Sequence, residues 1–490
     1  TNYGSSPPWV VYKTDNIIST SYSGDHSRTG DAVTASDQTI IVGSSFNTSE
    51  ADDGELGYVS VWFGGKYLTH LENVTTTLDT TTNEALNYRW NNHRLTASIK
   101  EPSWNQLGSN IEGEVDGDGA AGMAVALSGD GSIIAIGAQM ADNGNTHNSG
   151  QVRVFKRDPT NTSTAPIGWT QLGHDIWGEE GGSNPSSGDN DHSGQSVALS
   201  EDGLILAIGA KWNDGAANAN VTTGNKGHVR VYEWRKYTAN DSGVYHPSST
   251  SWTQNTSNQS PSQTKPIIVT DSSTLTVGNE YWMQIGADID GEYKNDESGY
   301  SLSMSNNGSI LAIGGYRNDD GGTTTTDRGH VRVYQRDPTS QTDPIGWSQL
   351  GSDIDGEASE DQSGISVALN GDGTIVAIGA NDNDAGTGDA NDDRGHVRVY
   401  EYNTGTSSWT QRGNDIDGEA AGDESGISVA LSDDGNTVAI GAIGQVRVYE
   451  WDATANNNNG DWDQLGSDID SNDAVGNCVA LSSDGSILAT

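Results

Sequence analysis

The chain has 490 residues, with 68 Asp and Glu against 24 Lys and Arg and a formal net charge of -44. This charge excludes nucleic acid as a partner, because binding a polyanion needs a basic surface, and it favours a saline or calcium-rich exterior where like charges are screened. The chain contains no apolar run near the roughly 18 residues that a membrane-spanning helix needs, so we expect no membrane span.

The first elements in the chain are two short predicted strands at residues 9–13 (WVVYK) and 16–20 (NIIST). From residue 32 onward a unit of four runs repeats, each roughly four to eight residues long, rich in β-branched or aromatic residues and bounded by turn residues. The first run is SVALS-like and recurs at residues 32–36, 123–128, 196–200, 301–305, 366–369, 428–432 and 478–482. An Asp-Gly or Asn-Gly turn follows, and we expect its glycine to supply the positive φ of a two-residue hairpin. ILAIGA-like, GHVRVYE-like and WTQLGSDI-like runs complete the unit.

Two insertions, 67–103 and 236–280, interrupt the units between the third and fourth runs. Loops of this length in a compact fold are usually functional or disordered. A notable share of the scarce basic residues lies in or beside the first insertion: Lys66, Arg89, Arg94 and Lys100. The final unit stops after its second run, at SILAT.

Small residues in the first run and aromatic residues in the third and fourth predict a sheet that is crowded at its first strand. This is the geometry of a propeller blade, whose inner strand lies near the central axis. We therefore predict an all-β fold, a seven-bladed β-propeller of four-stranded antiparallel blades that forms a single domain over residues 1–490. The last blade would be closed by strands from the N- and C-termini, which removes open sheet edges. The alternatives are a fragment of a longer protein, or missing strands donated by a neighbouring subunit.

The repeat resembles the FG-GAP class of β-propeller repeats in integrin α-chains, and more closely the arrays of such repeats in large secreted or surface proteins of algae and marine microbes. The resemblance covers nearly the whole chain and implies a propeller fold, although propellers host many unrelated activities. Integrin-type blades place a D-x-D-x-D-G calcium loop between their first and second strands. The corresponding turn here is only S-x-D-G, so no ligand residue is carried over from that family.

An acidic sequence connects the fourth run of each unit to the next unit, as in DIDGEASED at 353–361. Its carboxylates recur in three copies: Asp288, Asp290, Glu292 and Asp296; Asp353, Asp355, Glu357 and Asp361; and Asp415, Asp417, Glu419 and Asp423. A fourth, less complete copy has Asp468, Asp470 and Asp473. Carboxylates at i, i+2 and i+4, bent by a glycine, can converge on one point, and we expect them to bind Ca2+. The alternative is that these Asp side chains accept hydrogen bonds from nearby backbone N–H groups and shape the turn.

Histidines and arginines recur in the GHVRV run: His228, His330 and His396, with Arg230, Arg332, Arg398 and Arg447. Because the histidines occupy equivalent positions, we expect them to pack in the same way in each blade rather than to act as catalytic residues or metal ligands. The arginines alternate with Val along the strand, and we expect them to pair with acidic neighbours. Cys478 is the only cysteine, so an intrachain disulfide is excluded and we expect a buried, inert thiol.

Eight Asn-X-Ser/Thr sequons are candidate glycosylation sites: Asn47, Asn73, Asn161, Asn220, Asn240, Asn255, Asn258 and Asn307. Many sequons arise by chance in a chain this rich in Asn, Ser and Thr, and acidity that only maintains solubility is an alternative reason for the charge. The sequons and the acidity together favour a location outside the cell or at the cell surface.

Every acidic residue of the repeat recurs from blade to blade, whereas a propeller active site needs residues that differ from the repeat. We therefore expect no enzymatic activity. The sequence predicts an extracellular structural or adhesive module that is stabilised by cations and assembles with other surface components or with copies of itself, as a homo-oligomer or filament. The alternative is a secreted glycan-binding propeller, in which Trp177 and Trp212 contact sugar.

Overall fold

The computed structural model describes residues 10–12, 32–35, 39–44, 58–64, 86–90, 93–97, 104–113, 121–143, 147–179, 190–214, 224–238, 268–269, 275–319, 327–340, 342, 344–384, 392–470 and 476–490. These residues form an all-β structure whose only helix is the short α2 (Ala455–Asn458). Within these ranges, no helix is long and apolar enough to cross a membrane.

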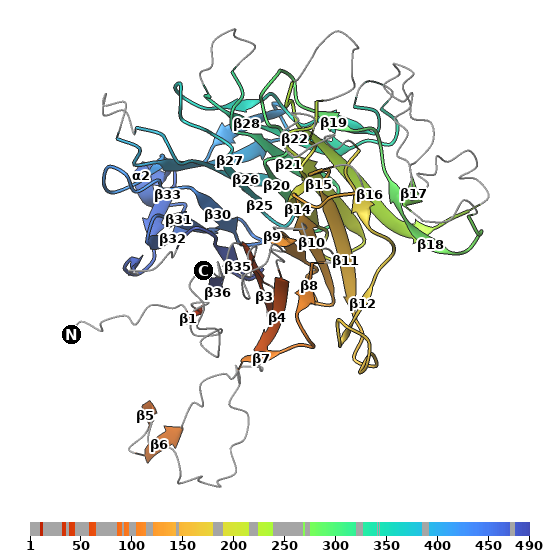
Figure 1. The fold of residues 1–490 in the computed structure, drawn as a ribbon. Helices are drawn as coiled ribbons and strands as arrows, with labels where there is room; N and C mark the ends of the chain where they lie inside the picture. The colour runs from red at the N-terminus through yellow and green to blue at the C-terminus, as the bar shows by residue number, and fades with distance from the viewer. Residues whose placement is uncertain are drawn as a thin grey trace, which may run out of the picture.

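The sheets repeat one antiparallel meander in which strands that follow one another in sequence are neighbours (Figure 1). The first strands are β2 (Ala32–Ala35), β9 (Ala121–Leu127), β14 (Ser193–Leu199), β20 (Ser301–Met304), β25 (Ser366–Leu369), β30 (Ser428–Leu431) and β35 (Ala480–Leu481). The second strands are β3 (Thr39–Ser44), β10 (Ile133–Ala138), β15 (Ile205–Ala210), β21 (Ile310–Gly315), β26 (Ile375–Ala380), β31 (Thr437–Ala442) and β36 (Ile487–Ala489). The third strands are β4 (Tyr58–Gly64), β11 (Gln151–Arg157), β16 (His228–Lys236), β22 (His330–Arg336), β27 (His396–Asn403) and β32 (Gln445–Asp452). The fourth strands are β7 (Trp104–Gln106), β12 (Trp169–Gln171), β18 (Glu280–Gln284), β23 (Trp347–Gln349), β28 (Ser408–Gln411) and β33 (Asp461–Gln464).

Each fourth strand is followed by a two-residue strand that pairs with the start of the same third strand. These short strands are β8 (Ile111–Glu112), β13 (Ile176–Trp177), β19 (Ile289–Asp290), β24 (Ile354–Asp355), β29 (Ile416–Asp417) and β34 (Ile469–Asp470). In the sheet of β27, Tyr400 pairs with Gln411 of β28, and His396 pairs with Asp417 of β29. The two strands are thus halves of one edge, separated at a glycine with positive φ such as Gly413 (φ 83°). The acidic sequence therefore begins within the sheet edge and not in the loop that follows it.

The last sheet joins the two ends of the chain. β1 (Val10–Tyr12) pairs with β36, which pairs with β35. The pairing of β1 with β36 is parallel, so the prediction of a wholly antiparallel last blade is wrong. No short turn connects these two strands, and hairpin geometry therefore does not impose the antiparallel direction, while a parallel ladder also satisfies backbone groups. The strand predicted at 16–20 lies outside the described residues.

Both insertions contain strands within their described parts. In the first, β5 (Leu86–Trp90) and β6 (His93–Ala97) pair with each other as a separate two-stranded sheet (Figure 1). In the second, β17 (Ile268–Val269) pairs with β18 and adds one strand to that sheet. The other residues of 67–103 lie outside the described ranges.

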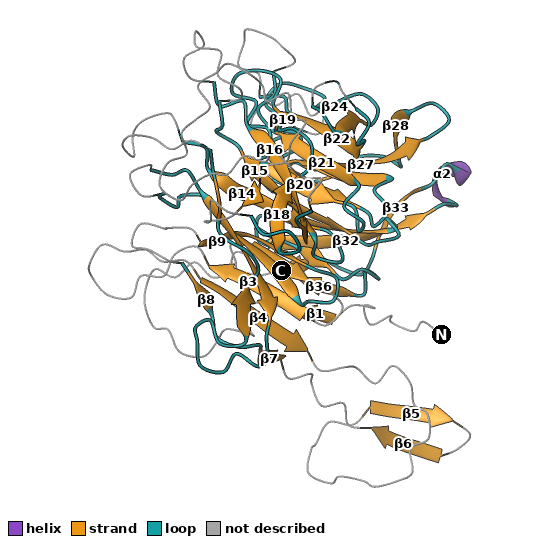
Figure 2. Ribbon diagram, turned by 90° about the vertical axis from the view of Figure 1, so that its right-hand side faces the viewer, coloured by secondary structure: helices purple, strands orange, loops and turns teal. Residues whose placement is uncertain are grey.

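Apolar side chains fill the space between neighbouring sheets. The loops gather at the strand ends (Figure 2). One cluster joins Ala207 and Val231 of one sheet to Leu311, Ile313 and Trp347 of the next. Every residue of β15 and β26 is buried, because both faces of these strands meet other side chains. This two-sided burial explains why the second run is continuously apolar instead of alternating.

The turns between first and second strands are longer than predicted. Asn370 N–H donates to the Ile375 carbonyl oxygen, which leaves residues 371–374 as the loop. Gly373 has the expected positive φ, 76°. The prediction of a two-residue hairpin is therefore wrong, although the reason for the glycine is confirmed.

Neighbouring sheets are tied together near their first strands. Each first strand contacts the next in the order β2, β9, β14, β20, β25, β30 and β35, and β35 also contacts β2. Backbone hydrogen bonds link the turns, including Asn306 N–H to Gly371 O (2.8 Å) and Gly371 N–H to Asp433 O (3.0 Å). A further link lies at the fourth strands, where Trp409 Nε1 of β28 donates to Leu350 O of the preceding sheet over 2.7 Å. This arrangement is that of a β-propeller.

Candidate metal centres

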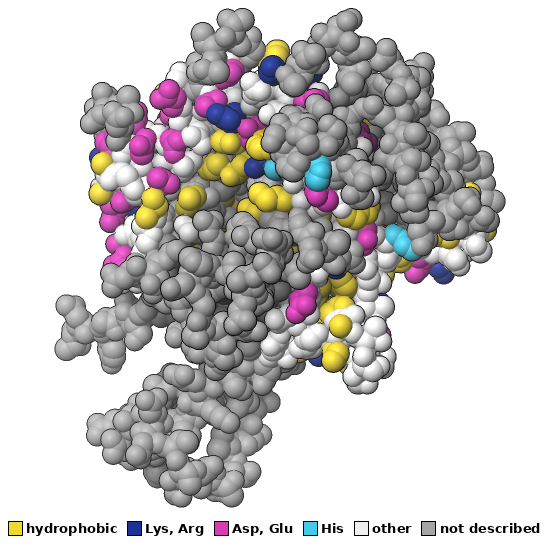
Figure 3. Space-filling model, in the orientation of Figure 1, with side chains coloured by type: hydrophobic (Ala, Val, Ile, Leu, Met, Phe, Trp, Pro, Cys, Tyr) yellow, Lys and Arg dark blue, Asp and Glu magenta, His cyan; other side chains and the backbone are white. Residues whose placement is uncertain are grey.

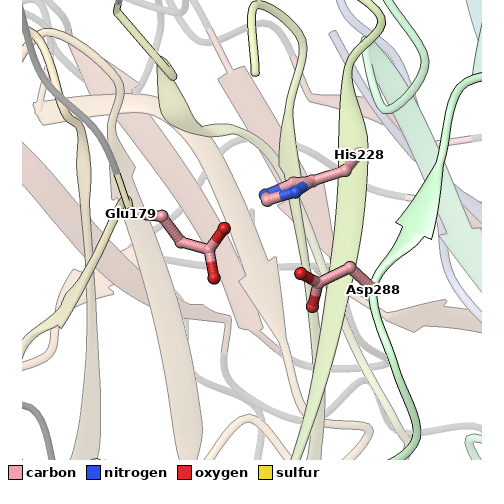
Figure 4. A group of neighbouring side chains, drawn as sticks. All are labelled: Glu179, His228 and Asp288. Carbon is pink, nitrogen blue, oxygen red and sulfur yellow. The ribbon is translucent and has the colours of Figure 1, made fainter. Parts of the chain in front are cut away.

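Among the residues that the structure describes, three groups of one histidine and two carboxylates lie at equivalent positions between neighbouring sheets. The groups are Glu179, His228 and Asp288; Glu292, His330 and Asp353; and Glu357, His396 and Asp415. In each group, one imidazole nitrogen and one oxygen of each carboxylate lie within 4.8 Å of one another. Figure 4 shows the ring of His228 and the carboxylates of Glu179 and Asp288 directed toward one another.

The histidine of each group is the first residue of a third strand, in β16, β22 and β27. Sheet pairing holds its backbone on both sides, as His330 pairs with Gly315 of β21 and with Asp355 of β24. Each of the three histidines is 1% exposed. Pairing on both sides and burial together leave the imidazole little freedom to turn away from the carboxylates.

The aspartate of each group lies between the fourth strand and the short strand of the same sheet. A glutamine four residues earlier holds it by donating to Oδ1, over 2.6 Å from Gln284 to Asp288 and over 2.6 Å from Gln411 to Asp415. In the second group, Nδ1 of His330 is 3.9 Å from Oδ2 of Asp353. The glutamine thus leaves the second carboxylate oxygen to face the imidazole.

The glutamate of each group comes from the preceding sheet. In the first and third groups, a buried arginine on the same strand as the histidine lies beside it. Arg398 Nη2 donates to the carbonyl oxygen of Asp355 over 2.7 Å, and its Nη1 is 3.7 Å from Oε1 of Glu357. In the first group, Arg230 Nη1 is 3.8 Å from Oε1 of Glu179. The prediction that the strand arginines pair with acidic neighbours is confirmed for Arg230 and Arg398. These contacts also join one blade to the next.

Burial keeps the three imidazoles neutral. Desolvation, assisted by the charge of Arg332, lowers the pKa of His330 to about 3, and desolvation assisted by the charge of Arg398 lowers the pKa of His396 to about 4. Desolvation likewise holds the pKa of His228 well below its ordinary value. The neutral ring is the form that binds metal ions, so no proton has to leave near neutral pH. Nε2 of each ring has no hydrogen-bond partner among the described residues.

The predicted calcium ligands have three different placements. Members of the groups are Asp288, Asp353, Asp415, Glu292 and Glu357. Asp290, Asp355 and Asp417 instead present their backbone carbonyls to Arg332, Arg398 and Arg447. Asp296, Asp361 and Asp423 accept hydrogen bonds from backbone N–H groups of their own turns. These last three residues therefore have the turn-shaping role that was the alternative interpretation.

Among the described residues, no group is formed by the carboxylates of a single acidic sequence. Each group instead combines a glutamate from one acidic sequence with an aspartate from the next. Glu419 is outside the groups, since Gln445 occupies the position that a histidine holds in β27. Calcium binding by the acidic sequences remains a prediction.

The sequence analysis assigned the three histidines a packing role and missed their place beside the carboxylates. Their burial agrees with that expectation. The available signal was the exchange at this position, which is His in β16, β22 and β27 but Gln151 in β11 and Gln445 in β32. Gln and His side chains are similar in size, but only the imidazole offers a ring nitrogen that can bind a metal ion. The exchange therefore marks a position where the chemistry differs between blades.

Two of the predicted glycosylation sites lie in described residues. The Asn161 amide nitrogen donates to Pro166 O (3.1 Å) and Trp169 O (2.7 Å), and a glycan would replace one of its two hydrogens, so at least one of these bonds would have to break. Asn307 is exposed, and its Oδ1 accepts from Ser309 N–H (2.9 Å). Outside the described ranges lie Asn47, Asn73, Asn220, Asn240, Asn255 and Asn258. Glycosylation of any of these sites remains a prediction.

The two tryptophans proposed to contact sugar are half-buried and contact other residues of the protein. Trp177 ends β13, and its carbonyl oxygen accepts from Arg230 over 2.8 Å. The Trp212 ring centroid lies 4.1 Å from that of His192 and 5.3 Å from Lys211 Nζ. Neighbouring side chains therefore already engage the Trp212 ring.

Three of the solved structures that are similar to this chain have low sequence identity to it. A candidate 6-phosphogluconolactonase from Bacteroides uniformis is 9% identical, with a TM-score of 0.39 over 78% of this chain and 80% of that chain. A protein of unknown function from Desulfotomaculum acetoxidans is 11% identical, with a TM-score of 0.38 over 74% of each chain. The periplasmic gluconolactonase of Pseudomonas aeruginosa is 14% identical, with a TM-score of 0.34 over 72% of this chain and 86% of that chain. No family model and no curated protein matches the sequence.

Two of these three proteins are named as lactonases, and this finding overturns the prediction of a non-enzymatic structural or adhesive module. The physical flaw lay in treating repetition as evidence against a site. Residues that recur from blade to blade come together as imidazole–carboxylate groups, which are the components of acid–base and metal chemistry. At these identities and TM-scores, the likeness assigns no activity, substrate or site residue to this chain.

Proposed function

We propose that this chain is a divalent-cation-binding β-propeller whose ions bind between neighbouring blades, at the three Glu–His–Asp groups. One observation carries the proposal: the same ligand types, from two adjacent blades, lie within 4.8 Å of one another at three equivalent positions. Neutral imidazoles and carboxylates are donors that divalent metal ions accept. A bound cation would also relieve the repulsion between two carboxylates that the fold brings close together.

The propeller would have seven blades built from FG-GAP-like repeats. The contacts between successive first strands, including that of β35 with β2, support a closed ring. The pairing of β1 with β36 supports a last blade made from both ends of the chain. The repeated sequence described above supports the FG-GAP-like assignment.

A cation at each group would link two neighbouring blades, because it would bind the glutamate of one blade and the histidine and aspartate of the next. Three divalent ions would leave most of the net charge of -44 to be screened by other cations or by a basic partner. Figure 3 shows Asp and Glu side chains spread over the described part of one face, with few Lys or Arg among them. This acidity supports a location outside the cell, where calcium and other cations are available.

Thermal unfolding of the EDTA-treated protein, with and without added divalent ions, tests the proposal. An ion present at 100 times its Kd adds about 2.7 kcal/mol of stability for each site. The midpoint should therefore rise and saturate with a divalent ion, beyond the rise that NaCl of equal ionic strength produces. If NaCl produces the whole rise, the groups bind no ion and the proposal is wrong.

A matched pair of substitutions separates specific binding from screening of the acidic surface. Glu357→Gln removes a carboxylate of the third group and should reduce the ion-dependent rise. Glu360→Gln makes the same change at an exposed carboxylate of the same acidic sequence, outside the groups, and should leave the rise intact. Equal effects of the two substitutions would point to screening instead of a site.

A further inference from the structure

The Glu–His–Asp groups have a natural counterpart in which an amide replaces the imidazole. Gln445 begins β32 and pairs with Asp470 of β34, just as His396 begins β27 and pairs with Asp417 of β29. The backbone position of the two side chains in their sheets is therefore the same. What differs at this position is the donor atom that the side chain can offer.

The carboxylates persist at the counterpart position. Gln464 donates to Oδ1 of Asp468 over 2.6 Å, as Gln411 does to Asp415. Glu419 stands in the preceding acidic sequence, two residues after β29. The interface at β32 thus retains both carboxylates and lacks only the ring nitrogen.

That nitrogen determines which ions the groups suit. Ca2+ takes six to eight oxygen ligands, whereas Zn2+ is satisfied by four ligands that include imidazole nitrogen and carboxylate oxygen. Three protein ligands and one water complete a zinc site, but they leave a calcium site mostly hydrated. Ligands around tetrahedral zinc lie roughly 3.4 Å apart, for bonds near 2.1 Å. The side chains of Glu292 and Glu357 are exposed and reach across from the neighbouring blade, so a change in their side-chain torsion angles can bring the carboxylates to this distance.

We propose that the three Glu–His–Asp groups bind a late first-row transition-metal ion of the Zn2+ class in preference to Ca2+, with one coordination position open to water. This inference rests on the proposed function and narrows it to an ion class. The imidazole is the deciding ligand, so the interface that carries Gln445 binds no such ion. The chain therefore contains both the sites and their own control.

Titration of the EDTA-treated full chain with Co2+ tests the proposal, because four-coordinate Co2+ has a strong visible absorption and Zn2+ displaces it. Ca2+ is then added in steps to the Co2+-loaded protein, in NaCl that screens the general acidic surface. We expect saturable absorption that Zn2+ abolishes and that Ca2+ displaces only at concentrations on the order of 100-fold higher or more. Loss of the absorption at equimolar Ca2+ would overturn the preference.

Two substitutions test the role of the imidazole. His396→Gln copies the residue found at the β32 position and should reduce the number of bound Co2+ ions by one. Gln445→His should raise that number by one, because Glu419 and Asp468 are already in place. Circular dichroism and an unchanged thermal midpoint without metal show that each variant is folded. An unchanged number of ions in folded His396→Gln would overturn the inference.

The outcomes also separate this inference from the proposed function. Binding of Ca2+ or Mg2+ at the groups without binding of Co2+ or Zn2+ would refute the ion class and leave cation binding in place. Absence of specific binding by any of these ions would refute both.

Discussion

Gly379 lies in β26 where two neighbouring sheets approach closely, and its replacement by alanine is a direct test of the propeller packing. A Cβ at this position would lie 2.0 Å from Gly426 O of the next sheet and 2.4 Å from Ser366 Oγ. Favourable contacts need about 3.5 Å, so the two backbones would have to separate by more than ~1 Å. The obstructing oxygen belongs to the backbone and cannot rotate away. We therefore expect Gly379→Ala to lower the free energy of unfolding by about 3 kcal/mol, the upper end of overpacking effects.

Urea unfolding followed by tryptophan fluorescence measures this loss. The thermal midpoint should fall by about 3 °C if the whole chain unfolds in one transition. Gly405→Ala is the matched control, because a Cβ there would meet only Asn403 Oδ1, at 3.2 Å, in an exposed turn. The control should change stability by less than about 0.5 kcal/mol. Equal stability of the two variants would refute the close approach of the sheets.

Two further predictions concern a hydrogen bond between sheets and a buried histidine. Trp409→Phe removes the donor to Leu350 O. It should lower the free energy of unfolding, measured by urea titration, by about 1–2 kcal/mol. An unchanged midpoint of unfolding would mean that this hydrogen bond contributes nothing to stability. Burial, assisted by the charge of Lys211, lowers the pKa of His192 to about 4. The unfolded chain takes up this proton near pH 6.5, so stability that is complete above pH 6.5 is lost as the pH falls toward 4, by up to about 3 kcal/mol. The unfolding midpoint of His192→Gln should therefore fall less than that of the wild type between pH 7 and pH 4, and parallel profiles would contradict this account.

The strands and their order were predictable from the sequence because they depend on patterns within one unit. A continuous apolar run such as residues 375–380 predicts a strand that is buried on both faces, and β26 is such a strand. The alternation in HVRVY likewise predicts a strand, and β27 begins at His396 as the pattern indicates. The parallel pairing of β1 was not predictable, since no turn connects it to β36 and sets its direction.

The candidate site was only partly predictable. The sequence pointed to Asp353 and Glu357 as metal ligands, but it placed them together in one loop and left His330 out. The structure puts Asp353 with Glu292 of the preceding blade, and Glu357 with the histidine and aspartate of the following blade. Spacing along the chain describes which groups are near in one strand or turn, and it contains no information on the twist and separation of adjacent sheets.

The sequence by itself determined the repeat, the strand order within each sheet and the excess of carboxylates. Only the tertiary structure decided which carboxylates meet, because the contacts at each Glu–His–Asp group form between blades. Local strand formation needs only the alternation and turn residues of one unit, whereas a site between blades depends on how two units pack. The same packing buries the histidines and keeps their rings neutral, which no pattern within a single repeat specifies.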